Sequence, residues 1–338
     1  MTWSYFLRRL LMFFLVIFTA ATINFILPHL SGRDPIGETV RQKIAGQGLT
    51  PTQGALMYKT MTHVFGLDQP LWMQYLTYLK SVATLDFGYS IADYPRKVMD
   101  IIVERGKITL PFLVVGIFIS FVLGILLGGL LGWNKMPRWV SNVFVPPMLI
   151  FSSVPQFLVA LVLIYFVAFK MKLFPMNLPY DNTLLENWGD PKFLLSYANH
   201  AVLPVLSIVV VSASGWALGM RAMMVTVECE DYTTFAEAKG LKTGRIFFRY
   251  LLRNAMLPSL TGLAISLGFI VTGSAVTENF FNYNGLGQTL GAAISVFNYF
   301  MLYGIVTIIV ISIALATFIM EMIYPLLDPR ISYRVQRG

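Results

Sequence analysis

The chain has 338 residues, of which 56% are hydrophobic and 12% are charged, and its formal net charge is +8. Soluble domains are charged at roughly one residue in four, so this composition excludes an ordinary soluble globular protein. The excess of Lys and Arg does not indicate nucleic-acid binding, because these residues lie in short clusters between apolar runs and form no basic domain. We therefore expect a membrane protein that binds lipid and no nucleic acid.

The apolar runs predict helices. Lipid offers no water to backbone N–H and C=O groups, so a spanning segment has to bond these groups internally. The runs do not alternate between polar and apolar residues, as the strands of a membrane barrel would. The expected fold class is an all-α membrane protein.

The first apolar run, residues 10–30, follows Arg8 and Arg9 and is long enough to cross a hydrocarbon core of about 30 Å. A signal peptide is the alternative, but the run exceeds the usual length of about 7–15 residues and no small-x-small cleavage site follows it. We predict that residues 1–30 form a cytoplasmic tip and the first transmembrane helix. Residues 31–108 contain no run of spanning length, and we predict a soluble extracytoplasmic insert there.

Five further apolar runs predict a five-helix core over residues 109–338 and about six spans in all. They lie at residues 110–133, 143–169, 201–223, 257–280 and 299–327. Short loops rich in Lys and Arg mark the cytoplasmic side of a membrane protein. With six spans, the basic clusters at Arg8, at Lys135, at about 225–257 and in the tail all fall on one side. We expect a multi-pass protein of the cell (plasma or inner) membrane with both termini in the cytoplasm.

Small residues inside the spans predict close packing of helices, and prolines there predict kinks. Gly124, Gly128 and Gly132 recur every fourth residue, which favours close approach of a neighbouring helix. Prolines interrupt the helical hydrogen-bond ladder, so we expect kinks in the third and fourth spans. These prolines are Pro146, Pro147, Pro155 and Pro204.

The sequence contains no group of residues that indicates catalysis. Glu278 and Glu321 lie in or near spans without an obvious partner, and residues 88–90 (Gly-Tyr-Ser) lack the trailing glycine of a nucleophile elbow. No phosphate-binding loop occurs, so the chain cannot hydrolyse ATP by itself. The single cysteine is Cys229, and His29, His63 and His200 show no metal-ligand spacing. We expect no enzyme, no metal and no cofactor in this chain.

A short helix that ends at a glycine is predicted in the loop at about 225–257. Thr234 and Glu237 have the spacing of a capping box, Lys239 suits a helix C-terminus, and Gly240 can adopt the left-handed conformation that ends a helix. Asp231 is an alternative N-cap, which would start the helix earlier.

A second helix is predicted after Thr243, its expected N-cap. Arginines recur along one face at every fourth position, which favours a helix lying on the membrane surface with its arginines on anionic lipid. They are Arg245, Arg249 and Arg253, and they are flanked by Phe247, Phe248, Leu251 and Leu252.

These residues resemble the membrane subunits of type I ABC importers, whose signature is an alanine-rich, glycine-terminated cytoplasmic loop. The matching residues are Thr234 to Leu241 together with Arg253 to Pro258. Further segments are similar to the dipeptide/oligopeptide branch: 5–11, 66–71, 86–90, 278–281, 284–287 and 328–330. Glu237 and Asn284 depart from this branch, which more often has a basic residue and a proline at these positions.

The resemblance implies a type I ABC importer permease fold and a transport role. The implied partners are two cytoplasmic ATP-binding subunits, which would bind ATP and Mg, a second and non-identical permease subunit, and an extracytoplasmic substrate-binding protein. The implied ATPase-coupling loop consists of Tyr232, Thr233, Thr234, Phe235, Ala236, Glu237, Ala238, Lys239, Gly240 and Leu241. Small residues such as Ala236 and Ala238 would permit close docking.

The expected cargo is an oligopeptide or a similar oligomer, and the branch also contains carriers of oligosaccharides and of nickel. An ATP-independent secondary carrier is the alternative of a different class. Such a carrier usually shows related halves or buried charge, and the sequence has no internal repeat.

Overall fold

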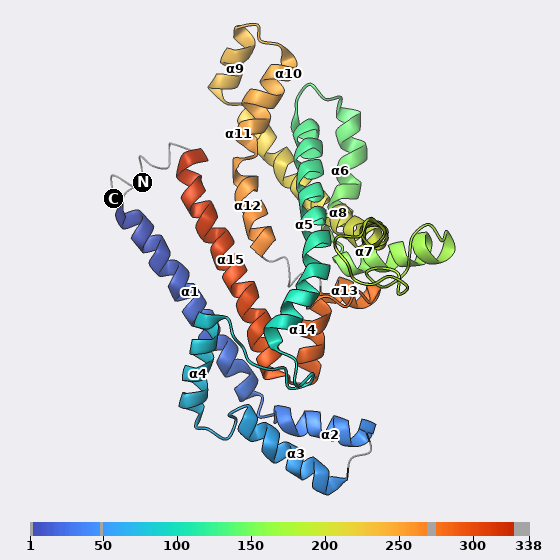
Figure 1. Cartoon of the computed structure of the whole chain (residues 1–338). Helices are drawn as coiled ribbons and strands as arrows, with labels where there is room; N and C mark the ends of the chain where they lie inside the picture. Colours follow the sequence, from blue (N-terminus) through green and yellow to red (C-terminus); the bar gives the residue numbers. More distant parts are fainter. Residues whose placement is uncertain (1–2, 48–49, 269–274, 328–338) are drawn as a thin grey trace. The chain divides into compact units, whose positions relative to one another are not determined.

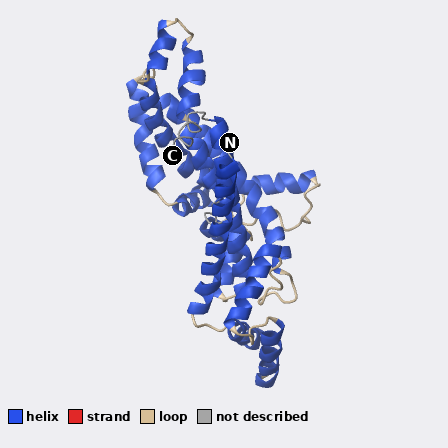
Figure 2. Cartoon of the chain, turned by 90° about the vertical axis from the view of Figure 1, so that its left-hand side faces the viewer, coloured by secondary structure: helices blue, strands red, loops and turns tan. Residues whose placement is uncertain are grey.

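The computed structural model describes residues 3–47, 50–268 and 275–327. Helices dominate this part of the chain, and no strand is assigned within it (Figure 2). The helices in the first part are α1 (Trp3–Leu30), α2 (Pro35–Gln47), α3 (Pro51–Val64), α4 (Leu71–Thr84), α5 (Val98–Gly132), α6 (Arg138–Ser153), α7 (Gln156–Leu163) and the π-helical η1 (Ile164–Lys170). They continue with α8 (Pro191–Glu228), α9 (Asp231–Ala238), α10 (Thr243–Arg245), the π-helical η2 (Ile246–Leu252), α11 (Arg253–Ala255), α12 (Leu257–Gly268), α13 (Ala275–Phe281), α14 (Leu286–Ser295) and α15 (Tyr299–Leu327). The all-α fold class is confirmed.

Four of the described helices, α1, α5, α8 and α15, are long and apolar enough to cross a membrane. A fifth span results if α6 is counted together with residues 156–170, although the two parts are bent by 105°. α12 is a shorter apolar helix, and the predicted span 257–280 includes residues 269–274, which lie outside the described residues. The number of six spans and the side of each loop stay predictions.

Two helices extend well beyond the apolar runs that predicted them. α5 begins at Val98 and not at residue 110, because its first turns contain charged residues such as Asp100 that a hydropathy pattern does not register. α8 begins at Pro191, where the Asp190 side chain accepts a hydrogen bond from the Lys192 N–H at 2.9 Å and caps the helix. α15 was predicted correctly from its apolar run.

The described chain forms two compact units. Of the described residues, those from 3 to 109 and from 284 to 321 form the first unit, and those from 110 to 283 with 322–327 form the second. The first unit contains α1 to α4, α14 and most of α15, and the second contains the helices from α6 to α13 (Figure 1).

In the first unit, hydrogen bonds join α1 to α15 near both ends of α1. The Glu321 carboxylate pairs with the Arg9 guanidinium, and the Glu321 carbonyl accepts a hydrogen bond from the Tyr5 hydroxyl at 3.1 Å. Near the other end, the Tyr299 hydroxyl donates to the Pro28 carbonyl at 3.0 Å. The sequence showed no obvious partner for Glu321, because Arg9 is distant in sequence and close in the fold.

The predicted insert, residues 31–108, contains the short helices α2, α3 and α4, and its last residues form the first turns of α5. Thr50 and Gln53 form a complete capping box at the start of α3. A small apolar cluster holds the first part of the insert together. It consists of Ile36, Val40, Met61 and Ile91.

Asn298, which is 2% exposed, fastens the segment before α5 to the start of α15. Its Oδ1 accepts hydrogen bonds from the Ile91 N–H at 3.3 Å and the Met301 N–H at 3.4 Å. Its Nδ2 donates to the Ser90 hydroxyl at 2.8 Å. Ser90 therefore has a structural role in the fold.

In the second unit, α5 packs closely against α8 through its glycines. A Cβ atom added at Gly128 would lie 2.2 Å from the Ala217 carbonyl oxygen, and one at Gly132 would lie 2.7 Å from the Arg221 carbonyl oxygen. At Gly124 the added atom would lie 2.3 Å from the Trp216 Cβ. The predicted close approach of a neighbouring helix is confirmed.

The third predicted span breaks at Pro155, between α6 and α7. Val154 is extended, with φ −81° and ψ 130°, and α7 starts directly after the proline. Because proline has no N–H to donate, it readily begins a new helix. The kink predicted for the third span is confirmed at this proline, where the two parts are bent by 105°. α6 and α8 continue as helices through the other prolines, which are Pro146, Pro147 and Pro204.

Candidate functional site

The predicted glycine-terminated helix is α9, which with α10 forms a helical hairpin in the second unit (Figure 1). Glu230 is the N-cap, with extended backbone (φ −76°, ψ 143°) and no side-chain capping bond, and its carbonyl accepts from the Thr233 N–H at 2.9 Å. The predicted capping box at Thr234 is therefore wrong. The alternative start at Asp231 is one residue away from the observed N-cap, and the Asp231 carboxylate lies in the first turn, where the helix dipole favours negative charge.

The end of α9 agrees with the prediction. Gly240 has φ +70°, and its N–H donates to the Glu237 carbonyl at 2.8 Å, while the Leu241 N–H donates to the Ala236 carbonyl at 3.3 Å. These two hydrogen bonds form a Schellman motif, which requires a left-handed residue at the position of Gly240. Glycine adopts this conformation without a steric penalty.

One face of α9 packs against its own chain. Thr233 and Ala236 are 4% and 2% exposed, and the Thr233 hydroxyl donates to the Val227 carbonyl at 3.2 Å. Ala236 belongs to an apolar cluster with residues of α8 and η2, against which Tyr232 and Leu241 pack while partly buried. Ala236 is therefore not available for docking, contrary to the expectation, because it fills the contact that holds α9 in place.

The opposite face of α9 is exposed. Phe235 is 60% exposed, and the Lys239 ammonium lies 4.4 Å from the centre of its ring. The remaining exposed members of the predicted loop are Thr234, Glu237, Ala238 and Gly240. A large exposed aromatic ring beside small residues is an arrangement typical of protein interfaces.

The loop between α5 and α6 contacts the end of α8 and the side of α9, which the sequence did not predict. The Lys135 ammonium lies 2.9 Å from the Glu237 carboxylate, and the Asn134 N–H lies 3.2 Å from both carboxylate oxygens of Glu228. The only sign of the Lys135–Glu237 contact in the sequence was Glu237 itself, an acidic residue where the similar transporters more often have a basic one. Its partner is about one hundred residues earlier in the chain.

The predicted second helix is present as α10, η2 and α11, and Lys242, not Thr243, occupies its N-cap position. Its arginines are exposed as expected, and Phe248 is 59% exposed beside them. The other flanking residues are buried against the unit: Phe247, Leu251 and Leu252. Contact with lipid stays a prediction.

Glu278 lies in α13 and is 1% exposed. The sequence showed no obvious partner for Glu278, and in the fold this residue does have one. The Asn284 segment that follows forms a turn, with φ +47° at Asn284, and leads into α14.

Residues 120–333, which include α9 and the loop at Lys135, match the family described as binding-protein-dependent transport system inner membrane component. The chain belongs to this family. It is therefore a membrane permease component of a transport system, and its several apolar helices agree with a multi-pass inner-membrane protein.

Related permeases match almost from end to end. The dipeptide transport system permease protein DppB of Bacillus subtilis is 29% identical over 336 residues, and the match covers 97% of each chain. The probable peptide ABC transporter permease protein y4tP of Sinorhizobium fredii is 29% identical, with 97% of this chain and 99% of the relative covered. The glutathione transport system permease protein GsiC of Escherichia coli K12 is 27% identical, with coverage of 98% and 99%. The predicted resemblance to peptide-type ABC permeases is confirmed.

Proposed function

We propose that this permease takes up oligopeptides, or chemically similar oligomers, in an importer driven by ATP. The importer would contain two cytoplasmic ATP-binding subunits, a second permease subunit that is not identical to this one, and an extracytoplasmic substrate-binding protein. The names of the three relatives, which specify dipeptide, peptide and glutathione transport, support a peptide cargo over oligosaccharides or nickel.

The proposed coupling role is supported by one observation: α9 has one buried face and one exposed face. Ala236 and Thr233 fix the helix to its unit, and Phe235 and Ala238 remain available on the surface. A helix that packs against its own chain on one face and is exposed on the other can bind a partner protein and transmit the partner's movement to the helices behind it. α9 would dock in a groove of an ATP-binding subunit, which would move the permease between inward-facing and outward-facing states.

Copurification tests the docking assignment. The tagged permease is extracted from its native membranes, and mass spectrometry identifies the copurifying ATPase chains. Phe235→Ala should weaken the association by about 2 kcal/mol, or about 30-fold, which is typical of a central aromatic residue in an interface. Phe248→Ala is the matched control, because Phe248 is equally exposed on the neighbouring helix and should leave the association unchanged. Equal recovery of ATPase chains with both variants would show that Phe235 does not contribute to the interface.

Two further changes separate docking from membrane insertion. Gly240→Pro cannot adopt the left-handed conformation of the Schellman motif, and Ala238→Trp adds bulk to the exposed face. Both variants should insert normally and hydrolyse ATP without uptake of peptide. Uptake at the wild-type rate per ATP would contradict the coupling role of this loop.

Cys229 provides a test of orientation, because it is the single cysteine, is exposed, and lies between α8 and α9. A membrane-impermeant maleimide applied to intact spheroplasts should leave it unlabelled, and permeabilised cells should show labelling. Labelling in intact spheroplasts would place α9 outside the cytoplasm and exclude docking to a cytoplasmic ATPase.

Transport by the reconstituted complex tests the cargo. Labelled di- to pentapeptides should accumulate in an ATP-dependent manner when the cognate binding protein is present. Accumulation of an oligosaccharide or of nickel under the same conditions, without accumulation of peptides, would overturn the peptide assignment.

A further inference from the structure

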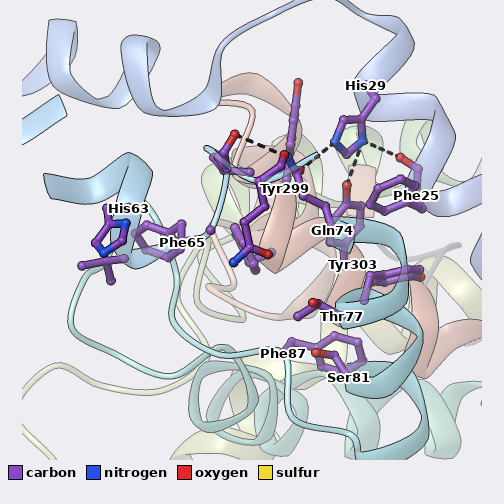
Figure 3. A pocket seen from close by; sticks show the side chains of 16 residues that line it. Phe25, His29, His63, Phe65, Gln74, Thr77, Ser81, Phe87, Tyr299 and Tyr303 are labelled. Atoms are coloured by element: carbon purple, nitrogen blue, oxygen red, sulfur yellow. Dashed lines mark hydrogen bonds between the residues drawn. The ribbon is translucent and has the colours of Figure 1, made fainter. Parts of the chain in front are cut away.

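The first unit contains a cavity of about 290 Å³ that the proposed coupling role does not use (Figure 3). Its walls come from α1, from the end of α3 and the loop that follows, from α4, and from α15. All of its lining residues belong to this one unit. Its volume is just below the range of about 300–1,000 Å³ that small-molecule sites occupy.

Aromatic rings form much of the wall. The rings of Tyr78 and Tyr303 are 4.6 Å apart between centroids, and Phe25 stacks at 5.6 Å from Tyr78 and 6.0 Å from Tyr303. Phe65 and Phe300 add a second pair at 5.1 Å. Such walls favour a flat apolar ring, which can stack on them or meet them edge to face.

Hydrogen bonds hold the wall in position. His29 Nδ1 lies 2.8 Å from the Phe25 carbonyl oxygen and 3.3 Å from the Tyr303 hydroxyl. Gln74 Nε2 donates to the Gln69 carbonyl at 2.7 Å, and Gln74 Oε1 lies 3.4 Å from His29 Nε2 (Figure 3). The site is therefore largely formed before a ligand enters, which reduces the entropy lost on binding.

Two hydroxyl groups in the wall are uncommitted. Thr77 and Ser81 lie four residues apart on α4, so they share one face of the helix with Tyr78 beside them. Neither hydroxyl makes a hydrogen bond within the described chain. They can bond to an amide or hydroxyl group of a ligand whose ring meets the aromatic wall.

The lining contains no Lys, Arg, Asp or Glu. Its only other titratable group besides His29 and the tyrosines is His63, which is exposed and lies 3.0 Å from the Asp68 carboxylate. That hydrogen bond lowers the pKa of Asp68, so Asp68 and His63 are engaged with each other. A charged ligand would lose its hydration here without gaining an opposite charge.

We propose that this cavity binds a small uncharged molecule that carries one flat apolar ring next to an amide or hydroxyl group. The ring stacks in the aromatic wall, and the polar group bonds to the Thr77 and Ser81 hydroxyls. The site is independent of the coupling role of α9, and the relatives' names do not imply it.

The test uses N-acetyl-L-phenylalaninamide, which has the ring and neutral amides, and N-acetyl-L-phenylalanine, which differs by one negative charge. Binding to the full chain in phosphatidylglycerol-containing nanodiscs is measured by saturation-transfer difference NMR titration. The neutral probe should bind saturably, and the anion should bind at least tenfold more weakly. The absence of saturable binding, or equal binding of the two probes, would overturn the proposal.

Three variants locate the site. Ser81→Trp fills the cavity and should weaken binding at least tenfold. Leu76→Trp is its control, because Leu76 is 55% exposed on the same helix and does not line the cavity. Ser81→Ala removes only the hydroxyl and should weaken binding severalfold with an unchanged circular dichroism spectrum. Binding that is insensitive to Ser81→Ala and to Ser81→Trp would place the probe elsewhere.

Discussion

Replacement of Gly128 by alanine tests the close contact between α5 and α8 in the second unit. The added Cβ would lie 2.2 Å from the Ala217 carbonyl oxygen and 2.8 Å from the Ala217 Cα. These atoms are backbone atoms of α8, so no side-chain rotation relieves the overlap, and the two helices have to separate locally. Overpacking of this kind costs about 1–3 kcal/mol. Alanine also has a helix propensity about 1 kcal/mol better than glycine, which hides part of the cost.

Gly219→Ala separates the two effects. Gly219 lies within α8, and an added Cβ there meets no atom within 4 Å. Both variants gain the same helix propensity, so the difference between their stabilities reports the overlap alone. We expect Gly128→Ala to be less stable than Gly219→Ala by about 1–3 kcal/mol.

The assay is equilibrium unfolding of the purified chain in mixed micelles with increasing dodecyl sulfate, followed by far-ultraviolet circular dichroism. The free energies of unfolding of both variants are compared with that of the wild type. If the two variants differ by less than roughly 0.5 kcal/mol, within which distant surface substitutions usually fall, the close contact between α5 and α8 would be refuted.

Two other contacts yield predictions of different kinds. Lys135→Glu should change stability by less than about 1 kcal/mol, because its ion pair with Glu237 is exposed, yet it should lower peptide uptake per ATP hydrolysed. The double exchange of Lys135→Glu with Glu237→Lys should restore this ratio, and a failure to restore it would argue against the ion pair as the cause. Asn298→Leu should destabilise the chain by about 1–3 kcal/mol in the same unfolding assay, because it leaves the buried Ile91 N–H without its acceptor. A wild-type midpoint for this variant would mean that the backbone finds another partner.

Features encoded locally were predictable from the sequence. The apolar run at 299–327 gave the bounds of α15, the spacing of Gly124, Gly128 and Gly132 gave a tightly packed helix face, and Gly240 gave the end of α9. Each of these depends on the chemistry of a few neighbouring residues, such as lipid solubility, the absence of a Cβ atom, or access to positive φ.

Features that depend on distant residues or on backbone geometry were not predictable. The start of α9 was misplaced because Asp231 and Thr234 both have side chains that can cap a helix. The observed N-cap, Glu230, makes no side-chain capping bond, and only its extended backbone sets the start. The contact of Lys135 with Glu237 joins two loops far apart in sequence. The two faces of α9 likewise emerge only when α8 and η2 are packed against it, which is why Ala236 was expected on the wrong side.

The hydrogen bonds between α1 and α15 constrain the order of events during biosynthesis. Tyr299, whose hydroxyl donates to the Pro28 carbonyl, is made 271 residues after Pro28, and Glu321 follows Arg9 by 312 residues. On the ribosome, α1 therefore enters the bilayer long before its eventual neighbour exists, and its own apolar length has to keep it there. A destabilised α1 would be exposed to membrane proteases throughout this interval, so substitutions there should reduce the amount of protein in the cell more than they reduce the activity of each finished molecule.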